Sequence, residues 1–124
     1  MNIEEYRNYC MNKKEVTEHF PFDNDTLVFK VCNKMFALAS LKKWEEGNAF
    51  INLKCDPEYA QELRTDYDSV KPGYHMHKAQ WNSVYMDGSL EDNLVYELID
   101  HSYELIVQKL PKKDKEVLEQ LKGE

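Results

Sequence analysis

The chain has 124 residues, a length typical of one domain and sufficient to bury a hydrophobic core without a metal or a disulfide. Hydrophobic residues make up 42% and aromatic residues 12%, which excludes an intrinsically disordered chain. The net charge of −7, from 16 basic and 23 acidic side chains, opposes binding to nucleic acid unless the basic groups gather on one face. We therefore expect a single domain spanning 1–124.

Three cysteines, Cys10, Cys32 and Cys55, form an odd set without CxxC spacing. This pattern argues against a disulfide framework and a zinc knuckle, so we expect reduced thiols. Residues 1–20 lack the basic and apolar regions of a secretory signal, and no apolar run reaches membrane-spanning length. These features favour a cytoplasmic location and no membrane partner.

The N-terminal segment carries a helix-start pattern. Asn2 is followed three residues later by Glu5, which predicts a capping box and a helix over 3–12. A turn-rich segment follows this helix. Its aromatic side chains, Phe20 and Phe22, are expected to plug an edge of the core.

Between residues 27 and 41 the hydrophobic pattern changes to period two. This alternation predicts two antiparallel strands joined by a hairpin at Asn33-Lys34. In the second strand the same alternation places Phe36 and Leu38 on one face. A sheet therefore begins in this part of the chain.

Further elements follow the hairpin. A third strand is expected over 50–55, after a turn at 45–48. Asp56 followed by Pro57 predicts the start of a second helix, because Asp caps free amides and Pro loses no bond at the first helical position. Another strand is expected over 81–86 because of its β propensity.

The C-terminal third is dominated by the longest helical pattern. Ser89 is expected to cap this helix, and Pro111 should end or kink it. The segment 112–124 has hydrophobic residues at helical spacing and predicts a short appended helix. The predicted fold class is α+β, an antiparallel sheet with helices packed on one face.

Three segments carry distinctive residues. They are Lys-Pro-Gly-Tyr-His-Met-His-Lys-Ala-Gln-Trp-Asn-Ser-Val at 71–84, Asn-Lys-Met-Phe-Ala at 33–37, and His-Ser-Tyr-Glu-Leu-Ile-Val at 101–107. In this order and spacing they resemble the MmcQ/YjbR family over nearly the whole chain. The resemblance implies a CyaY-like α+β fold, and it implies DNA binding through likeness to a double-wing transcription-factor motif.

The sequence departs from the family pattern at three positions. His77 stands where the family usually has Asn, and Gln80 stands where it usually has His. A role that needs an imidazole at position 80 is therefore in doubt for this chain. Asn33 replaces the usual hairpin Gly, a substitution that a turn tolerates.

Two histidines and three aromatic residues are candidates for a site. If the backbone is extended, His75 and His77 share a strand face about 6 to 7 Å apart, which suits either one metal or a hydrogen-bonded structural pair. No third ligand is evident nearby, so we favour the structural pair. Trp81, with Tyr74 and Tyr85, could stack on a base or a flat ligand, although core packing is favoured for Trp81.

Two groups of lysines could contact an anion. Lys71 and Lys78 flank the aromatic residues and suit a phosphate or a carboxylate, or else they are solvated side chains. Lys112 and Lys113 belong to a group at the end of the long helix, where the helix dipole already accounts for cations. They form a binding patch only if the fold brings them beside Lys71 and Lys78.

Catalysis has little support in the sequence. Asp100, His101 and Ser102 are residue types found in hydrolases, but consecutive helical side chains point about 100° apart and cannot form a relay. The cysteines lie in apolar surroundings, where thiols are usually inert. We expect no enzyme activity, no cofactor and no metal site.

The leading hypothesis is a small non-enzymatic binding protein, with DNA as the partner implied by the resemblance. The sheet edge and the loop 71–82 would form the contact, with lysines on phosphates and Trp81 or Tyr74 near a groove. The alternative is a protein-interaction or small-ligand module that binds a peptide or a small anion at the same loop, and a monomer is expected in either case. The candidate binding residues are Lys71, Tyr74, His75, His77, Lys78, Trp81, Asn82, Lys112 and Lys113.

Overall fold

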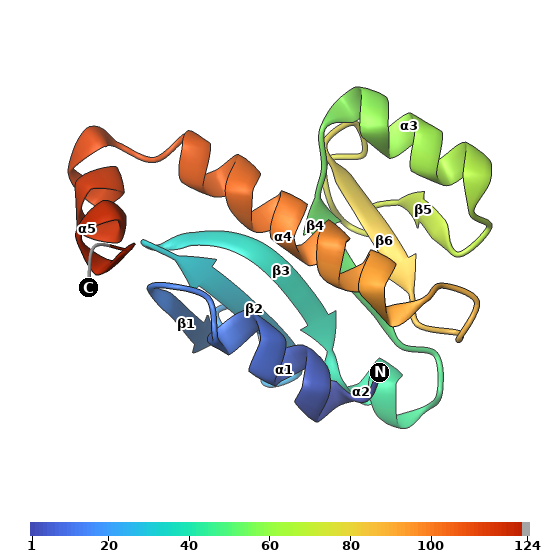
Figure 1. The fold of residues 1–124 in the computed structure, drawn as a ribbon. Helices are drawn as coiled ribbons and strands as arrows, with labels where there is room; N and C mark the ends of the chain where they lie inside the picture. The colour runs from blue at the N-terminus through green and yellow to red at the C-terminus, as the bar shows by residue number, and fades with distance from the viewer. Residues whose placement is uncertain (123–124) are drawn as a thin grey trace.

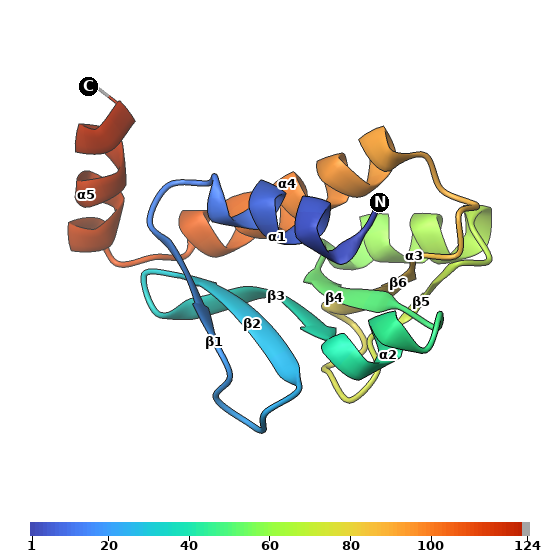
Figure 2. The same cartoon turned by 90° about the horizontal axis from the view of Figure 1, so that it is seen from below.

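Six antiparallel strands form one sheet, and three helices cover one of its faces. The computed structural model describes residues 1–122, and the strand order is β1-β2-β3-β4-β6-β5. Helices α1, α3 and α4 lie on the same side of the strands (Figures 1 and 2). The predicted α+β class, with helices on one face of an antiparallel sheet, is confirmed.

The bounds of the elements are as follows. The strands are β1 (Val16–His19), β2 (Thr26–Val31), β3 (Lys34–Ser40), β4 (Phe50–Lys54), β5 (Val70–Pro72) and β6 (Trp81–Tyr85). The helices are α1 (Ile3–Met11), α2 (Leu41–Glu45), α3 (Pro57–Asp66), α4 (Asp92–Gln108) and α5 (Lys112–Lys122).

Both edge strands, β1 and β5, are absent from the sequence-based prediction. Within β1 only Val16 is buried, so the strand carries no alternating pattern. β5 has three residues and ends at Pro72, a residue that sheets tolerate at their edges because it lacks an N–H donor. Pairing with longer neighbours, rather than local pattern, therefore makes these segments extended.

The β2–β3 hairpin turns one residue earlier than predicted. Cys32 and Asn33 have φ values of 47° and 68°, the positive values of a two-residue type I′ turn, and Lys34 already belongs to β3. The register then shifts between Phe29 and Lys30. Because this bulge changes the alternation, the expected pairing of Phe36 and Leu38 on one face is wrong.

The two faces of β3 contribute to different hydrophobic clusters. Phe36 lies in the core under the helices, whereas Leu38 lies on the opposite face. The core cluster includes Tyr6 of α1, Phe29 of β2 and Ile99 of α4, all fully buried. This packing holds α1 and α4 against one face of the sheet, and the opposite face, which carries Leu38, is not covered by them.

Two predicted helix starts are confirmed. The Asn2 side chain accepts from the Glu5 amide at 2.8 Å, and the Glu5 carboxylate accepts from the Asn2 amide at 3.2 Å, which completes the capping box. The Asp56 carboxylate accepts from the Tyr59 amide at 3.1 Å, with Pro57 in the first turn of α3. Local hydrogen bonding therefore sets both boundaries.

Two other helix starts differ from the prediction. Ser89 does not cap α4, because its hydroxyl donates to the Asp87 carboxylate and also hydrogen-bonds with the Ser69 hydroxyl, and the N-cap residue is Glu91 without a side-chain bond. The expected turn at 45–48 is preceded by the short helix α2, whose Lys43 amide donates to the Ser40 side chain. The β3–β4 connection is therefore partly helical.

The chain ends at one extremity of the sheet. Pro111 separates α4 from α5, and α5 extends over most of the segment expected as an appended helix. Leu118 of α5 is buried against the core, and residues 123 and 124 lie outside the described residues. Within residues 1–122 no helix is both long and apolar enough to cross a membrane.

Candidate functional site

A groove opens on the sheet face opposite α1, α3 and α4. It has a volume of about 650 Å³ and lies between strands β2, β3, β4 and β6 and the loop that joins β5 to β6. Figure 2 shows this loop on the side of the strands away from α1, α3 and α4. The apolar lining residues are Phe22, Met35, Leu38, Phe50, Met76 and Trp81.

Hydrogen bonds to β4 and β6 fix the first half of the loop. The Tyr74 amide donates to the Ser83 hydroxyl at 2.8 Å, and the Asn52 side-chain amide donates to the Tyr74 carbonyl at 3.1 Å. The Ser83 hydroxyl in turn donates to the Asn52 carbonyl oxygen at 2.5 Å. Since each polar group has a partner, this wall of the groove is held in place by the sheet.

Arg64 of α3 holds the second half of the loop. Its Nε donates to the Asn82 side-chain oxygen at 2.7 Å, and its Nη2 donates to the carbonyls of Trp81 and Lys78. The Lys78 ammonium donates to the Gly73 carbonyl at 2.7 Å, which closes the loop on itself. Arg64 is absent from the sequence-based candidates, although an arginine in an otherwise acidic helix is a weak signal of a specific partner.

His75 and His77 do not share a strand face. His75 has φ of 58°, a left-handed conformation rather than an extended one, so the condition for the two histidines to share a strand face is not met. Both rings instead line the groove, and the His75 ring packs edge-on against Tyr74 at 4.1 Å between centroids. Among the described residues, no three His, Cys, Asp or Glu side chains are grouped as a metal would require.

The aromatic cluster differs from the predicted trio. Trp81 is 7% exposed and packs against Val28 and Leu38 on the floor of the groove. Tyr74 and Tyr85 contact Phe50 instead, with ring centroids at 5.8 and 5.1 Å. Phe50, which the sequence-based candidates omit, therefore connects the two tyrosines.

Phe20 and Phe22 do not plug the core. Phe20 is 48% exposed and Phe22 is 65% exposed, so the expected burial of this pair is wrong. Both residues lie in the connection between the end of β1 and the start of β2, and Phe22 borders the groove. An exposed phenylalanine beside an apolar groove is a feature typical of binding sites.

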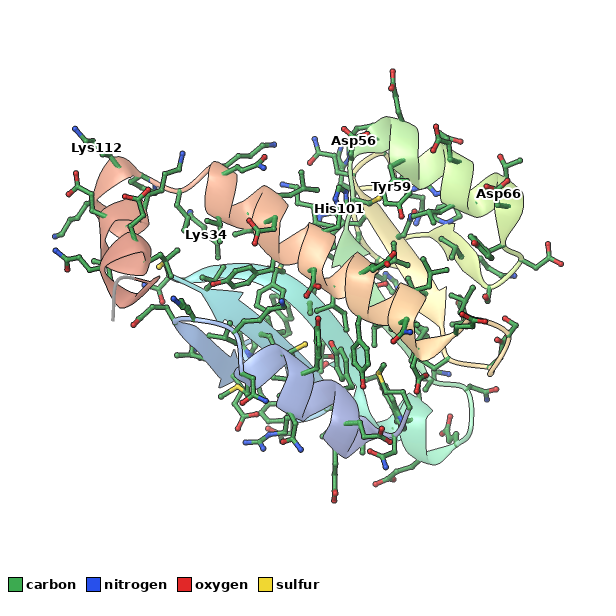
Figure 3. The ribbon with its side chains drawn as sticks, viewed as in Figure 1. Lys34, Asp56, Tyr59, Asp66, His101 and Lys112 are labelled. Atoms are coloured by element: carbon green, nitrogen blue, oxygen red, sulfur yellow. The ribbon has the colours of Figure 1, made fainter. Side chains whose placement is uncertain are left out.

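The candidate lysines lie in separate places. Lys71 lies on edge strand β5, and its ammonium is 5.7 Å from the ring centroid of Tyr85 on β6. The Lys78 ammonium instead donates to the Gly73 carbonyl within the loop. Lys112 and Lys113 begin α5, which lies at the opposite end of the molecule from β5 (Figures 1 and 3). The fold therefore does not bring the two pairs together.

Asn82 is also unsuited to direct contact with a partner. Its side chain is 2% exposed beneath α3, where its oxygen accepts from Arg64. Among the described residues its amide nitrogen has no hydrogen-bond partner. The role that the structure gives Asn82 is to hold Arg64 and, through it, the loop.

The hydrolase-like residues of α4 point to different partners. Asp100 accepts from the Tyr9 hydroxyl at 2.7 Å, and Ser102 donates to the Phe36 carbonyl at 2.6 Å. His101 faces the start of α3 (Figure 3), where its Nε2 accepts from the Asp56 amide at 3.1 Å. Burial lowers the pKa of His101 below its ordinary value. All three side chains serve packing between elements.

The thiols are shielded. Cys10 and Cys55 are buried, and burial raises their pKa values to about 12 and about 11. The pKa of Cys32 in the hairpin is raised as well, mainly by desolvation. Since a thiolate is the reactive form, none of the three is an activated nucleophile.

The geometry defines a class of protein: a helix-covered antiparallel sheet with a loop-walled groove on its open face. The family model described as YjbR matches residues 11–105, and the chain belongs to the YjbR family. It is 37% identical over 121 residues to the "Uncharacterized protein YjbR" of Escherichia coli K12, covering 98% of this chain and 100% of that protein. It is 41% identical over 95 residues to YbdF of Escherichia coli O157:H7, covering 77% and 75% of the two chains.

Solved structures show the same fold. The Deinococcus radiodurans protein DR2400, described with the domain DUF419, has a TM-score of 0.86 at 35% identity and covers 94% of this chain and 87% of its own. A Pseudomonas syringae protein, target PsR293, has a TM-score of 0.72 at 27% identity and covers 85% and 98% of the two chains. The family expected from the three sequence segments is thus confirmed.

Proposed function

We propose that this chain is a non-enzymatic binding protein whose groove takes a small, largely apolar ligand. The observation that carries the proposal is a preformed groove of about 650 Å³ with apolar walls and a loop fixed by hydrogen bonds. Ligand sites in proteins usually have volumes of about 300 to 1,000 Å³ and a mostly apolar lining with a few polar groups. The proposal retains the cytoplasmic location and the monomeric state expected from the sequence.

Side-chain exposure supports a site that is open to a partner. Phe22 and Tyr74 are 65% and 55% exposed at the borders of the groove. Leu38 and Trp81, by contrast, are buried in its floor and have little freedom to move. Exposed aromatic borders over a rigid floor allow a ligand to bury new apolar surface without rearranging the sheet.

DNA binding, which the family resemblance implies, has less support from the positions of the basic residues. Lys78 is engaged by the Gly73 carbonyl, and α5, which carries Lys112 and Lys113, lies at the opposite end of the molecule from β5, which carries Lys71 (Figure 1). A net charge of −7 adds long-range repulsion from a phosphate backbone. We therefore rank a small ligand above DNA.

A neutral fluorescent dye tests the proposal. N-phenyl-1-naphthylamine, whose emission rises in apolar surroundings, is titrated into the protein and into two variants. Phe22→Ala should weaken binding severalfold because it removes an exposed border of the groove, whereas Phe20→Ala should not because Phe20 does not line the groove. Phe20 is a matched control, since both phenylalanines are exposed in the same connection.

The dye result has a clear negative outcome. Absence of saturable binding, or equal weakening by both substitutions, would contradict a site in the groove. Titration of a labelled DNA duplex over a salt series tests the alternative function, DNA binding, because phosphate contacts make the affinity for DNA fall with rising salt. Salt-dependent duplex binding that Phe22→Ala leaves unchanged, together with no dye binding, would favour DNA.

A further inference from the structure

We propose that the natural ligand of the groove is an anion, specifically a carboxylate carried on a flat or aliphatic apolar body. This inference rests on the proposed function and adds the chemical class of the ligand. It follows from the charge of the lining, from the distribution of polarity along the groove, and from which donors in the lining are already engaged.

The lining contains no carboxylate although the chain is acidic. Within residues 1–122, no Asp or Glu lines the groove, while the chain carries 23 acidic residues in all. The ionisable basic groups of the lining are Lys43, His75 and His77. A described lining without Asp or Glu that contains an ammonium group and two imidazoles suits an anion better than a cation, although Asp23, Asp25 and Glu46 lie just behind it.

Polarity is unevenly distributed along the groove. The strand register pairs Thr26 with Ser40 at the end of β3 that leads into α2, and α2 carries Lys43. At the other end of β3, Met35 packs against the cluster of Val28, Leu38 and Trp81. A ligand with one charged end and an apolar body matches this arrangement, with its charge near α2.

The hydroxyls at the polar end are already engaged. The Ser40 hydroxyl donates to the Asp25 carboxylate at 2.5 Å, and the Thr26 hydroxyl donates to the Asp23 carboxylate at 3.1 Å. Asp25 and Asp23 also accept backbone amides, so their carboxylate oxygens are engaged within the turns. Among the described lining residues at this end, the remaining side-chain donor is the Lys43 ammonium.

Lys43 is available to a ligand. Its ammonium lies 3.9 Å from the Glu46 carboxylate, and both side chains are more than two-fifths exposed. An exposed ion pair at this distance contributes little, so the ammonium can exchange partners at small cost. A carboxylate in the groove would gain a charge-assisted hydrogen bond from Lys43.

The test compares two probes of the same shape. Naphthalene-2-acetate and naphthalene-2-acetamide share an apolar body and differ in charge, and their affinities are measured by NMR titration of the ¹⁵N-labelled protein at neutral pH. We expect the carboxylate to bind about tenfold more tightly, the effect of one hydrogen bond to a charged group. Shifts should concentrate on Lys43, residues 74–77 and the Trp81 indole.

Two variants make the result specific. Lys43→Met should abolish the preference for the carboxylate while leaving the affinity for the acetamide unchanged. Lys42→Met, an exposed neighbour on α2 that does not line the groove, should keep the preference. A preference that survives in the Lys43→Met protein would overturn the assignment of Lys43 as the donor.

The outcomes separate this inference from the proposed function. Equal binding of the two probes in the groove would overturn the anionic ligand and leave the apolar site standing. Binding of neither probe, or shifts confined to residues outside the groove, would overturn both.

Discussion

The amide of Gly73 donates to the Trp81 carbonyl at 2.8 Å, and these two residues are in such close contact that a side chain at position 73 has no room. A Cβ at position 73 would lie 2.8 Å from the Trp81 Cβ and 3.0 Å from that of Met76. Glycine is therefore required here for close approach. The close approach of Gly73 and Trp81 brings the two ends of the loop together, so that the loop forms one wall of the groove.

Gly73→Ala should destabilise the protein by about 1 to 3 kcal/mol, because the loop must shift to relieve the overlap with Trp81. Urea denaturation measures the loss, and the Trp81 indole resonance reports the shift. Gly47→Ala is the control: it also loses stability because φ is 79°, but no described atom lies within 4 Å, so the Trp81 resonance should not move. An unchanged indole resonance in Gly73→Ala would contradict the steric account.

Arg64→Ala should lower the free energy of unfolding by about 2 kcal/mol, because it removes hydrogen bonds to Asn82 and to two loop carbonyls. Hydrogen exchange at residues 77–82 should accelerate. Arg64→Lys should not restore stability, since a lysine lacks the planar donor fork. The control is Arg7→Ala, which breaks an exposed pair with Glu18 and should have a smaller effect. Equal losses for the two alanine variants would refute the anchoring role of Arg64.

Protonation of His101 should destabilise the fold on the acidic side of neutrality. Burial lowers its pKa below 6.5, and its neutral Nε2 accepts from the Asp56 amide. The unfolded chain therefore takes up the proton first as pH falls through about 6.5, and the stability present above that pH is progressively lost. His101→Gln, which cannot titrate, should flatten the stability profile below about pH 6.5. Identical profiles of stability against pH for the unsubstituted protein and His101→Gln would exclude a contribution from His101 protonation.

The buried thiols should resist alkylation in the folded protein. With pKa values of about 12 and about 11, Cys10 and Cys55 remain protonated at pH 8 and are also inaccessible. Iodoacetamide followed by peptide mass spectrometry should label Cys32 first and the other two only after unfolding. Native labelling of Cys10 at the rate of Cys32 would contradict the burial.

The same thiols predict a decline in stability at high pH. In the unfolded chain a thiol ionises near its ordinary pKa of 9.0, whereas Cys10 and Cys55 stay neutral in the fold to higher pH. Stability is therefore fully present below about pH 9 and is lost as pH rises through the folded values. Urea midpoints should fall as the pH rises from 8 to 11. An unchanged midpoint would contradict the raised pKa values of Cys10 and Cys55.

Short-range features were predictable from the sequence, and features that depend on pairing were not. The capping bonds of Asn2 and Asp56 join residues three apart, so the residue types alone indicate them. Ser89 has the same residue type as a cap, but its hydroxyl bonds to Asp87, two residues away, and to Ser69, twenty residues away, and the helix begins later. A local pattern fails where other partners, near or distant, compete for the same hydroxyl.

The candidate site shows the same division. The loop that carries Tyr74, His75 and His77 stood out in the sequence and does line the groove. The rest of the lining could not be foreseen, because the bulge in β3 decides that Leu38 faces the groove, and the β1–β2 connection brings Phe22 beside it. Side-chain direction in a strand reverses with a shift of one residue, and periodicity cannot locate such a shift.

By itself, the sequence determined the α+β class and the YjbR family and singled out the loop that lines the groove, because local hydrogen bonding, alternation and residue motifs act within short stretches of chain. Only the tertiary structure decided that β5 with Lys71 and α5 with Lys112 lie at opposite ends of the molecule, that Arg64 holds the loop, and that no Asp or Glu among the described residues lines the groove. These properties depend on which distant segments the sheet brings together, and the order of its strands is set by packing of the whole core.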